Sequence, residues 1–192
     1  SDTDWAGCIR TRKSTQGGMT MVGQHCIKSW STTQAFISLS SAESEYYGIV
    51  KGASVSLGMQ SMFRDMGFST NIEILTDASA AKGIASRRGL SSRTRHVAVH
   101  YLWLQERVIS GQIKVSKVKG TSNPADLLTK HLTQECMQRY MQTVNLIFKD
   151  GRAEIAPQVS SVNPLRTHCW KSDLHLRSFR ASRGALSEGG CK

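Results

Sequence analysis

The stretch from Asn71 to Ser86, NIEILTDASAAKGIAS, decides the fold class. Its first half alternates apolar and polar side chains, with Ile72 and Ile74 on one face, as in a half-buried strand. Its second half, from Ala78 onward, is rich in alanine and favours a helix. An acidic residue, Asp77, stands at the junction. A strand that runs directly into a helix is typical of α/β proteins, so we expect parallel strands here.

The residues far upstream of this unit predict an antiparallel arrangement. Short β-prone runs at 19–22 and 26–30 flank Gly23 and predict a hairpin. Residues 1–7 can form a strand that precedes it. We therefore expect three antiparallel strands at the start of the chain.

A long helix is predicted between the hairpin and the central unit. From residue 42 to 57, apolar side chains recur at helical spacing, and Ser40 with Glu43 has the spacing of a capping box. Each glycine in a helix costs about 1 kcal/mol relative to alanine. Close packing against a sheet would explain the three glycines in this helix, which are Gly48, Gly52 and Gly58.

The downstream segments complete an α/β pattern. Residues 97–109 predict an amphipathic helix, and residues 113–118 alternate as a strand. Asn123 and Pro124 have the order of an N-cap and a first helical residue, so a last helix is expected there. The predicted order is β β β α β α α β α, a mixed sheet with helices packed on it.

Composition divides the 192 residues near residue 150. Residues 151–192 carry seven Lys/Arg against three Asp/Glu and show little apolar periodicity. We expect one folded domain over residues 1–149, followed by a basic, flexible extension over residues 150–192.

The charge balance predicts a polyanionic partner. The chain has 25 Lys/Arg against 14 Asp/Glu, a net charge of +11, which favours nucleic acid first and acidic membrane second. No apolar run approaches the length of a membrane span, and the first residues have no signal-peptide core, so an intracellular protein is expected. The five cysteines are irregularly spaced without a C-x-x-C pair, so we expect reduced thiols.

Acidic residues fall at the ends of several predicted elements, where they can converge on one point. Carboxylates that lie close together repel one another and therefore attract a cation. A pair of Mg²⁺ ions about 3.5–4 Å apart is an arrangement that cuts phosphodiesters. Each position also suits helix capping or simple exposure, and both interpretations remain open at this point. The acidic residues are Asp2 and Asp4, Glu43 or Glu45, Asp77, and Asp126.

Six short motifs occur in one order within residues 1–133. Together they resemble the ribonuclease H domain at the end of copia-type retrotransposon Pol polyproteins. The motifs are SDTDWAG (1–7), RKSTQG (12–17), IKSWS (27–31), LSSAESEY (39–46), SRTRHV (92–97) and NPADLLTK (123–130).

The resemblance implies a ribonuclease H-like fold, a five-stranded mixed sheet flanked by helices, with a first strand that is shortened at Ser1. It implies endonucleolytic hydrolysis of the RNA strand of RNA/DNA hybrids by two bound Mg²⁺ ions, for which Mn²⁺ is expected to substitute. It assigns the catalytic and metal-binding roles to Asp2, Glu45, Asp77 and Asp126.

Cations cluster between residues 82 and 119, where the only acidic residue is Glu106. We expect Arg93, Arg95 and Lys117 to contact the nucleic-acid backbone. The resemblance also implies the reverse transcriptase portion of the same polyprotein as a partner, no membrane, and a cytoplasmic or nuclear location or one in virus-like particles. Two alternatives are a catalytically inactive nucleic-acid-binding remnant and a structural module that supports an upstream reverse transcriptase.

Overall fold

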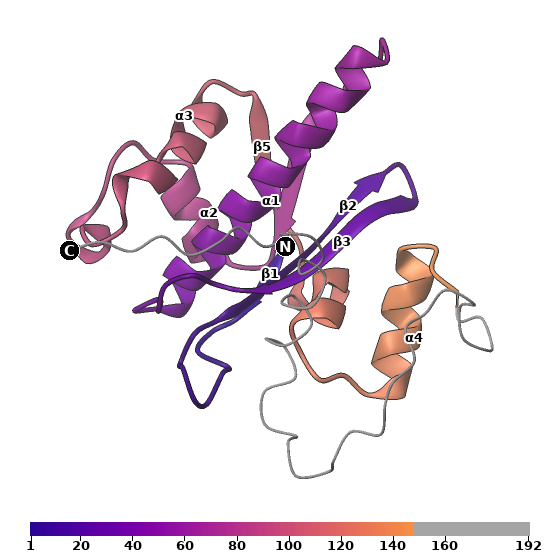
Figure 1. Ribbon diagram of the computed structural model, residues 1–192, viewed down its shortest axis with the longest axis horizontal. Coiled ribbons are helices and arrows are strands. Elements are labelled where there is room, and N and C mark those ends of the chain that lie inside the picture. Colours follow the sequence, from indigo (N-terminus) through magenta and orange to yellow (C-terminus); the bar gives the residue numbers. More distant parts are fainter. Residues whose placement is uncertain (148–192) are drawn as a thin grey trace, which may run out of the picture. The chain divides into compact units, whose positions relative to one another are not determined.

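A computed structural model describes residues 1–147 of the chain (Figure 1). The predicted boundary at residue 150 and the expected flexible extension over 150–192 lie outside the described residues and stay predictions. The described part is a mixed α/β structure, as the sequence predicts.

Five strands are present in the described part, at the predicted places. The first three pair antiparallel in the order β1-β2-β3, and the last two pair parallel. The two hairpin strands are longer than the runs predicted at 19–22 and 26–30. The strands are β1 (Asp2–Asp4), β2 (Thr15–Val22), β3 (His25–Thr33), β4 (Ile72–Thr76) and β5 (Ile113–Lys117).

These strands do not form the single five-stranded ladder that was expected: the described residues hold one three-stranded sheet and one two-stranded sheet. β1 has only three residues, which pair with β2, and no ladder joins it to β4 in the described residues. The Ser1 amino group donates a hydrogen bond to the Leu75 carbonyl oxygen of β4 at 2.8 Å. Beyond this bond, a cavity of about 220 Å³ separates β2 from β4, and its lining includes Met19, Met21, Trp30, Phe63 and Ile74.

The long predicted helix is α1 (Ser41–Asp65), and it begins where its capping residue predicts. Ser40 Oγ accepts a hydrogen bond from the Glu43 amide at 3.2 Å. The helix after β4 is α2 (Ser79–Ala85), which confirms the strand-to-helix unit that decided the fold class. It begins without a side-chain cap, so Asp77 does not serve as its N-cap.

The helix predicted over residues 97–109 is confirmed only in its second half, as α3 (Trp103–Ile109). Before it lie two short 3-10 turns, η1 (Ser92–Thr94) and η2 (Val99–Tyr101). Ala98, directly before η2, has an extended backbone with ψ 137°. An extended residue cannot continue the i to i−4 hydrogen bonds of an α-helix, so the helical segment begins after Ala98.

The last predicted helix is also shorter than expected. Asn123 caps it by accepting a hydrogen bond from the Ala125 amide at 3.3 Å, but the element is a 3-10 turn, η4 (Pro124–Leu128). It follows another short turn, η3 (Gly120–Ser122), and precedes α4 (Gln134–Thr143). The end of η4 packs closely on β2, where glycine is required at one position, because a Cβ on Gly17 would lie 2.8 Å from Leu128 Cβ.

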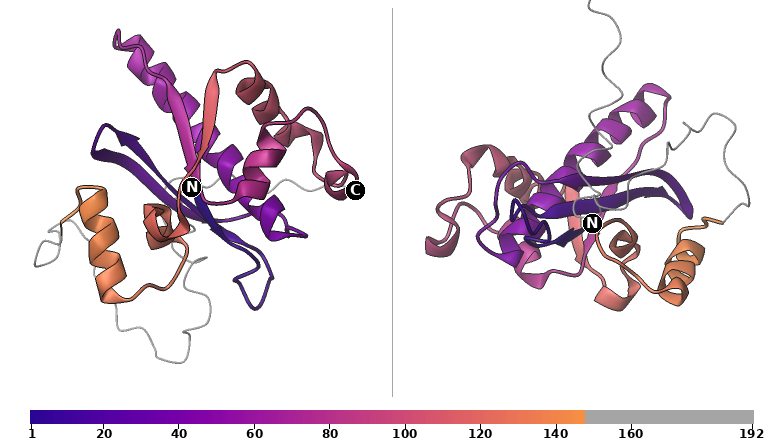
Figure 2. Two further views of the ribbon diagram at one scale, coloured as in Figure 1. Left: turned by 180° about the vertical axis from the view of Figure 1, so that it is seen from behind. Right: turned by 60° about the horizontal axis from the view of Figure 1, so that its bottom comes forward.

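The hydrophobic core lies between α1 and the β4–β5 pair, with α2 and α3 packed against it. On the other side of the β-hairpin from α1 lie η4 and α4 (Figure 2). None of the helices in residues 1–147 has the length and apolar character needed to cross a bilayer. The core side chains with at most 1% exposure are Tyr46, Ile49, Ala53, Ala81, Ala85, Leu104 and Ile113.

The close approach of α1 to β1 requires glycine at one position. A Cβ on Gly48 would lie 2.7 Å from Thr3 Cγ2, and Thr3 is buried. Gly58, further along the same helix, has no atom within 4 Å of such a Cβ. The predicted packing of helix glycines against the sheet therefore applies to Gly48 and not to Gly58.

These two glycines form a matched pair for a stability test. Gly48→Ala should lower the free energy of unfolding by about 1–3 kcal/mol, because the added methyl group overpacks the contact with Thr3. Gly58→Ala should raise it by up to about 1 kcal/mol through helix propensity alone. Urea denaturation of both variants measures the difference, and equal effects would contradict the packing at Gly48.

Candidate metal centre

Three of the four predicted acidic residues meet at one point. Asp2 lies in β1, Glu45 in the second turn of α1, and Asp77 directly after β4. Each offers a carboxylate oxygen, and the three oxygens lie within 4.8 Å of one another. Glu45 and Asp77 follow Asp2 by 43 and 75 positions in the sequence. The packing of α1 and β4 next to β1 brings the three side chains together.

Glu45 ties the start of α1 to β1. Its Oε1 accepts a hydrogen bond from the Thr3 amide at 3.1 Å. Its Oε2 is buried and has no hydrogen-bond partner among the described residues. A buried carboxylate oxygen without a partner is costly, so this atom is available to a ligand.

Burial has a clear electrostatic consequence for Glu45. Desolvation, and next the charges of Asp2 and Asp77, raise the pKa of the Glu45 carboxyl to about 7. The hydrogen bond from Thr3 only partly offsets this effect. Glu45 therefore carries its negative charge at considerable cost unless a cation lies nearby.

Asp2 is the most buried acid of the group, at 1% exposure. Its Oδ2 accepts a hydrogen bond from the Thr129 hydroxyl, and its Oδ1 accepts one from Lys130 Nζ at 3.1 Å. Burial raises the pKa of the Asp2 carboxyl, while Thr129 and Lys130 act in the opposite direction. Asp2 is thus stabilised by groups from the segment that follows η4.

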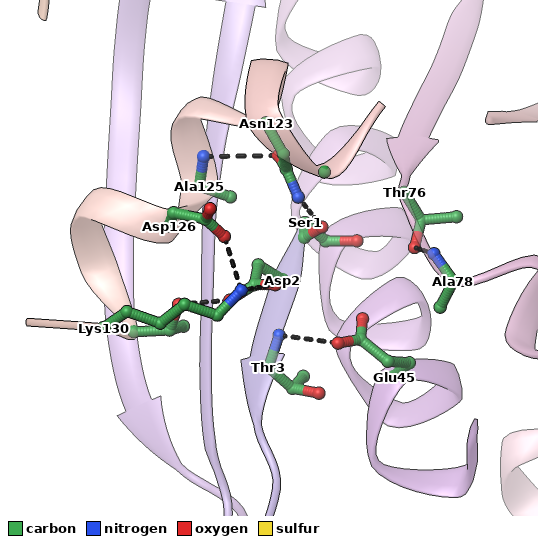
Figure 3. A network of polar contacts seen from close by, with 12 residues as sticks. Ser1, Asp2, Thr3, Glu45, Thr76, Ala78, Asn123, Ala125, Asp126 and Lys130 are labelled. Carbon is green, nitrogen blue, oxygen red and sulfur yellow. Dashed lines mark hydrogen bonds and ion pairs between the residues drawn. The ribbon is translucent and has the colours of Figure 1, made fainter. Parts of the chain in front are cut away.

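The fourth predicted acid, Asp126, is connected to the other three through Lys130. Asp126 Oδ1 accepts a hydrogen bond from Lys130 Nζ at 2.8 Å, and its Oδ2 accepts one from the Tyr140 hydroxyl at 3.2 Å. The Lys130 ammonium therefore lies between the carboxylates of Asp2 and Asp126 (Figure 3). Partial burial disfavours this ammonium, but Asp126 and Asp2 raise the pKa of Lys130 above its ordinary value.

Sequence reasoning did not find Thr129, Lys130 or Tyr140 as parts of the site. Lys130 follows Asp126 by four residues, a spacing at which oppositely charged side chains pair on a helical turn, so a signal for it exists. Tyr140 lies in α4, beyond the motifs, and no spacing rule points to it.

The remaining acids serve other roles. Glu43 is buried, and its carboxylate accepts hydrogen bonds from the Leu39 amide and the Tyr47 hydroxyl and contacts His96 Nε2 at 2.8 Å. Burial alone would raise the pKa of the Glu43 carboxyl, but these hydrogen bonds outweigh burial and hold the pKa below its ordinary value. Asp4 is not part of the acidic cluster found in the described residues. Glu43 is therefore structural, and Glu45 is the acid of α1 that faces Asp2.

The donor set fits a divalent cation that prefers oxygen, such as Mg²⁺ or Mn²⁺. Asp2, Glu45 and Asp77 offer converging carboxylate oxygens, and the unpartnered Glu45 Oε2 is the atom that most needs a cation. Asp2 and Asp126 are the two acids that could share a second ion, at the place that the Lys130 ammonium holds.

Two of the three predicted nucleic-acid contacts are exposed, and one of them lies next to an acid of the site. Lys117 is exposed at the end of β5, in register with Thr76 of β4 and thus beside Asp77. Arg95 is exposed and directly precedes His96. The side chain of Arg93 lies outside the described part of the structure, so its predicted contact stays a prediction.

The raised pKa of Glu45 predicts how the stability of the metal-free protein depends on pH. The folded state keeps a proton on Glu45 up to about pH 7, whereas the unfolded chain loses it near pH 4.5. The free energy of unfolding should therefore fall as the pH rises through this window. Glu45→Gln removes the charge, so it should stabilise the protein by about 1–3 kcal/mol at pH 8 and much less at pH 5. Denaturation in chelator at both pH values tests this, and an effect independent of pH would be contrary to it.

Comparison with known proteins bears on the origin of this chain. It is 29% identical over 131 residues to the retrovirus-related Pol polyprotein from transposon TNT 1-94 of Nicotiana tabacum, an alignment that covers 68% of the chain. It is 29% and 28% identical, over 149 and 148 residues, to the retrovirus-related Pol polyproteins from transposons RE2 and RE1 of Arabidopsis thaliana, with 77% and 76% of the chain covered.

The chain spans about a tenth of the length of these curated relatives. No protein-family model matches it, and no solved structure does. The relatives confirm the Pol polyprotein origin that the six sequence motifs indicated. The chain is a homologue of one segment of the retrovirus-related Pol polyproteins of plant copia-type transposons.

Proposed function

We propose that this chain is a ribonuclease H domain that hydrolyses the RNA strand of RNA/DNA hybrids during retrotransposon reverse transcription. The observation that carries the proposal is the convergence of Asp2, Glu45 and Asp77 within 4.8 Å, with Asp126 joined to Asp2 through Lys130. Carboxylates from four separate elements that gather in this way are an expected arrangement for binding divalent cations that act on phosphodiesters. The homology to Pol polyproteins supports the same activity.

Each acidic side chain would have a defined role in holding two Mg²⁺ ions, or Mn²⁺ in their place. When bound, these ions supply the activation of a water molecule and the stabilisation of the leaving 3′ oxygen. Thr129 orients the Asp2 carboxylate, Tyr140 orients Asp126, and the Thr3 amide fixes one oxygen of Glu45. No histidine is assigned as a proton shuttle.

The substrate would be held by cations around the acids. Four carboxylates repel a phosphate backbone, so exposed lysines and arginines nearby are needed to bind it. Lys117, beside Asp77, and Arg95 are suited to this by their exposure. Contacts to phosphates read the shape of the hybrid and its 2′-hydroxyl groups rather than base sequence, so low sequence specificity is expected.

The proposal includes a structural and a cellular setting. The arrangement of β1 to β5 with flanking helices is compatible with a ribonuclease H-like fold in which the two sheets correspond to one five-stranded mixed sheet. The reverse transcriptase portion of the same polyprotein would be the partner, in the cytoplasm, the nucleus or a virus-like particle. The two alternatives, an inactive nucleic-acid-binding remnant and a structural module, both predict that no cleavage occurs.

Asp77→Asn tests the catalytic assignment directly. This variant should abolish Mg²⁺-dependent cleavage of RNA in a hybrid, because it removes one charged metal ligand. It should bind the hybrid as well as the parent or better, since it removes a negative charge and no positive one. A gel assay of cleavage and an anisotropy assay of binding measure the two effects.

Glu73→Gln is the matched control, because Glu73 is an exposed acid that pairs with Lys114 and lies on β4, the strand that ends directly before Asp77. It should cleave like the parent. If Asp77→Asn cleaves the hybrid as well as the parent does, the assignment of Asp77 as a metal ligand is wrong. A parent protein that binds hybrid without cutting it would favour the inactive remnant.

The basic surface is tested by its dependence on salt. Each phosphate contact should contribute about 0.7 to 0.9 to the slope of log affinity against log salt concentration. Replacing Arg93, Arg95 and Lys117 together by alanine should lower hybrid affinity and flatten this slope by about 2. The thermal midpoint should change little, because exposed cations contribute little to stability. An unchanged slope would place the substrate elsewhere.

A further inference from the structure

Lys130 occupies an unusual position for a cationic side chain in a site built to bind metal. Its ammonium lies 2.8 Å from Asp126 Oδ1 and 3.1 Å from Asp2 Oδ1. These are the two acids that could share a second divalent cation. An ammonium and a metal ion cannot both fill the space between the same two carboxylate oxygens, because both are cations that need those oxygens as close partners.

We infer that Lys130 is an internal counter-ion that competes with a divalent cation for Asp2 and Asp126. In the metal-free protein it neutralises the buried pair of carboxylates, and it must move away when a metal binds there. This inference rests on the proposed function, and it gives Lys130 the role of setting the affinity of the site for metal. Lys130 is a positioning residue, since it acts on the two acids and not on the substrate.

The burial of the two carboxylates explains why a counter-ion is needed. Asp2 is 1% exposed and Asp126 is 7% exposed. Thr129 and Tyr140 each donate one hydrogen bond to these acids but carry no positive charge. Apart from Lys130, no Lys or Arg forms an ion pair with either acid in residues 1–147. Without Lys130 or a metal ion, two buried carboxylates would lie close together with no ion-pair partner in residues 1–147.

The geometry of Lys130 also allows it to leave. Its side chain is 42% exposed, and its long flexible stem follows a short 3-10 turn rather than lying within a packed helix. A lysine ammonium is strongly hydrated and has several rotatable bonds behind it, so it can move into solvent. The buried acids, by contrast, are held by Thr129 and Tyr140 and would stay in place.

The test is metal binding by the full chain in the absence of nucleic acid. Lys130→Met removes the charge and keeps most of the stem. Its affinity for Mn²⁺, measured by calorimetric titration, should be at least about tenfold higher than that of the parent, a factor that corresponds to about 1.4 kcal/mol. Lys114→Met is the matched control, because Lys114 pairs with Glu73 at 2.9 Å on the exposed surface of β4 and β5. This control should bind Mn²⁺ like the parent.

Thermal unfolding provides a second readout. In chelator, Lys130→Met should melt at a lower temperature than the parent, and saturating Mn²⁺ should raise its midpoint by more than it raises that of the parent. If Lys130→Met is unfolded in chelator, refolding on addition of Mn²⁺, followed by circular dichroism, is the expected result. Failure to refold would overturn the inference, because the lysine would then be required with or without metal.

The outcomes separate this inference from the proposed function. Mn²⁺ affinity that is unchanged or weaker in Lys130→Met, with normal binding by the parent, would overturn only the role of Lys130. A parent protein and a Lys130→Met variant that both fail to bind Mn²⁺ would overturn the proposed function as well. Lys130→Arg keeps the charge, so its Mn²⁺ affinity should stay close to that of the parent, and a large gain would also contradict competition by charge.

Discussion

The structure depends on one electrostatic constraint, the burial of Asp2 beside other carboxylates. Asp2 is nearly inaccessible to solvent, and Glu45, Asp77 and Asp126 all lie around it. Folding brings these charges together against their mutual repulsion. Part of that repulsion is balanced by the hydroxyl of Thr129 and the ammonium of Lys130. The remainder, concentrated on Glu45, is what makes the site a candidate for divalent cations.

Close backbone packing makes this convergence possible. Gly48 lets α1 approach β1, and Gly17 lets the segment after η4 approach β2 from the other side. The strand that carries Asp2 is therefore held between the helix that carries Glu45 and the turn that carries Asp126. The Asn123 side chain adds a hydrogen bond to the Ser1 carbonyl oxygen at 3.1 Å, which ties that turn to the start of β1. The site depends on these contacts as much as on the acids themselves.

Much of the fold could be predicted from local sequence patterns. Alternation in residues 72–76 and the alanine-rich run after Asp77 correctly predicted β4 and α2, because both signals depend on nearest neighbours. The late start of α3 could not be predicted in this way, since the extended backbone at Ala98 and the 3-10 turn after it fall within an apparently continuous helical pattern. The gap between the two sheets also depends on long-range pairing, which periodicity does not report.

The acids of the site could be predicted from the sequence, but the contacts that join them could not. The resemblance selected Asp2, Glu45 and Asp77, which the structure brings together, and distinguished Glu45 from the nearby Glu43. It did not reveal how Asp126 is connected to them. That connection depends on Lys130 and on Tyr140 of α4, and contacts of this kind follow from tertiary packing rather than from spacing. Residue identity indicated the chemistry, and geometry indicated how its charges are balanced.

The central claim is that these acids bind divalent cations, and a crystal structure of the protein grown with Mn²⁺ tests it most directly. Anomalous scattering locates manganese independently of any assumption about its ligands. The account predicts an anomalous peak at a coordination distance of about 2.1 Å from oxygens of Asp2, Glu45 and Asp77. A structure with these three carboxylates in place and manganese bound elsewhere, or nowhere, would contradict it.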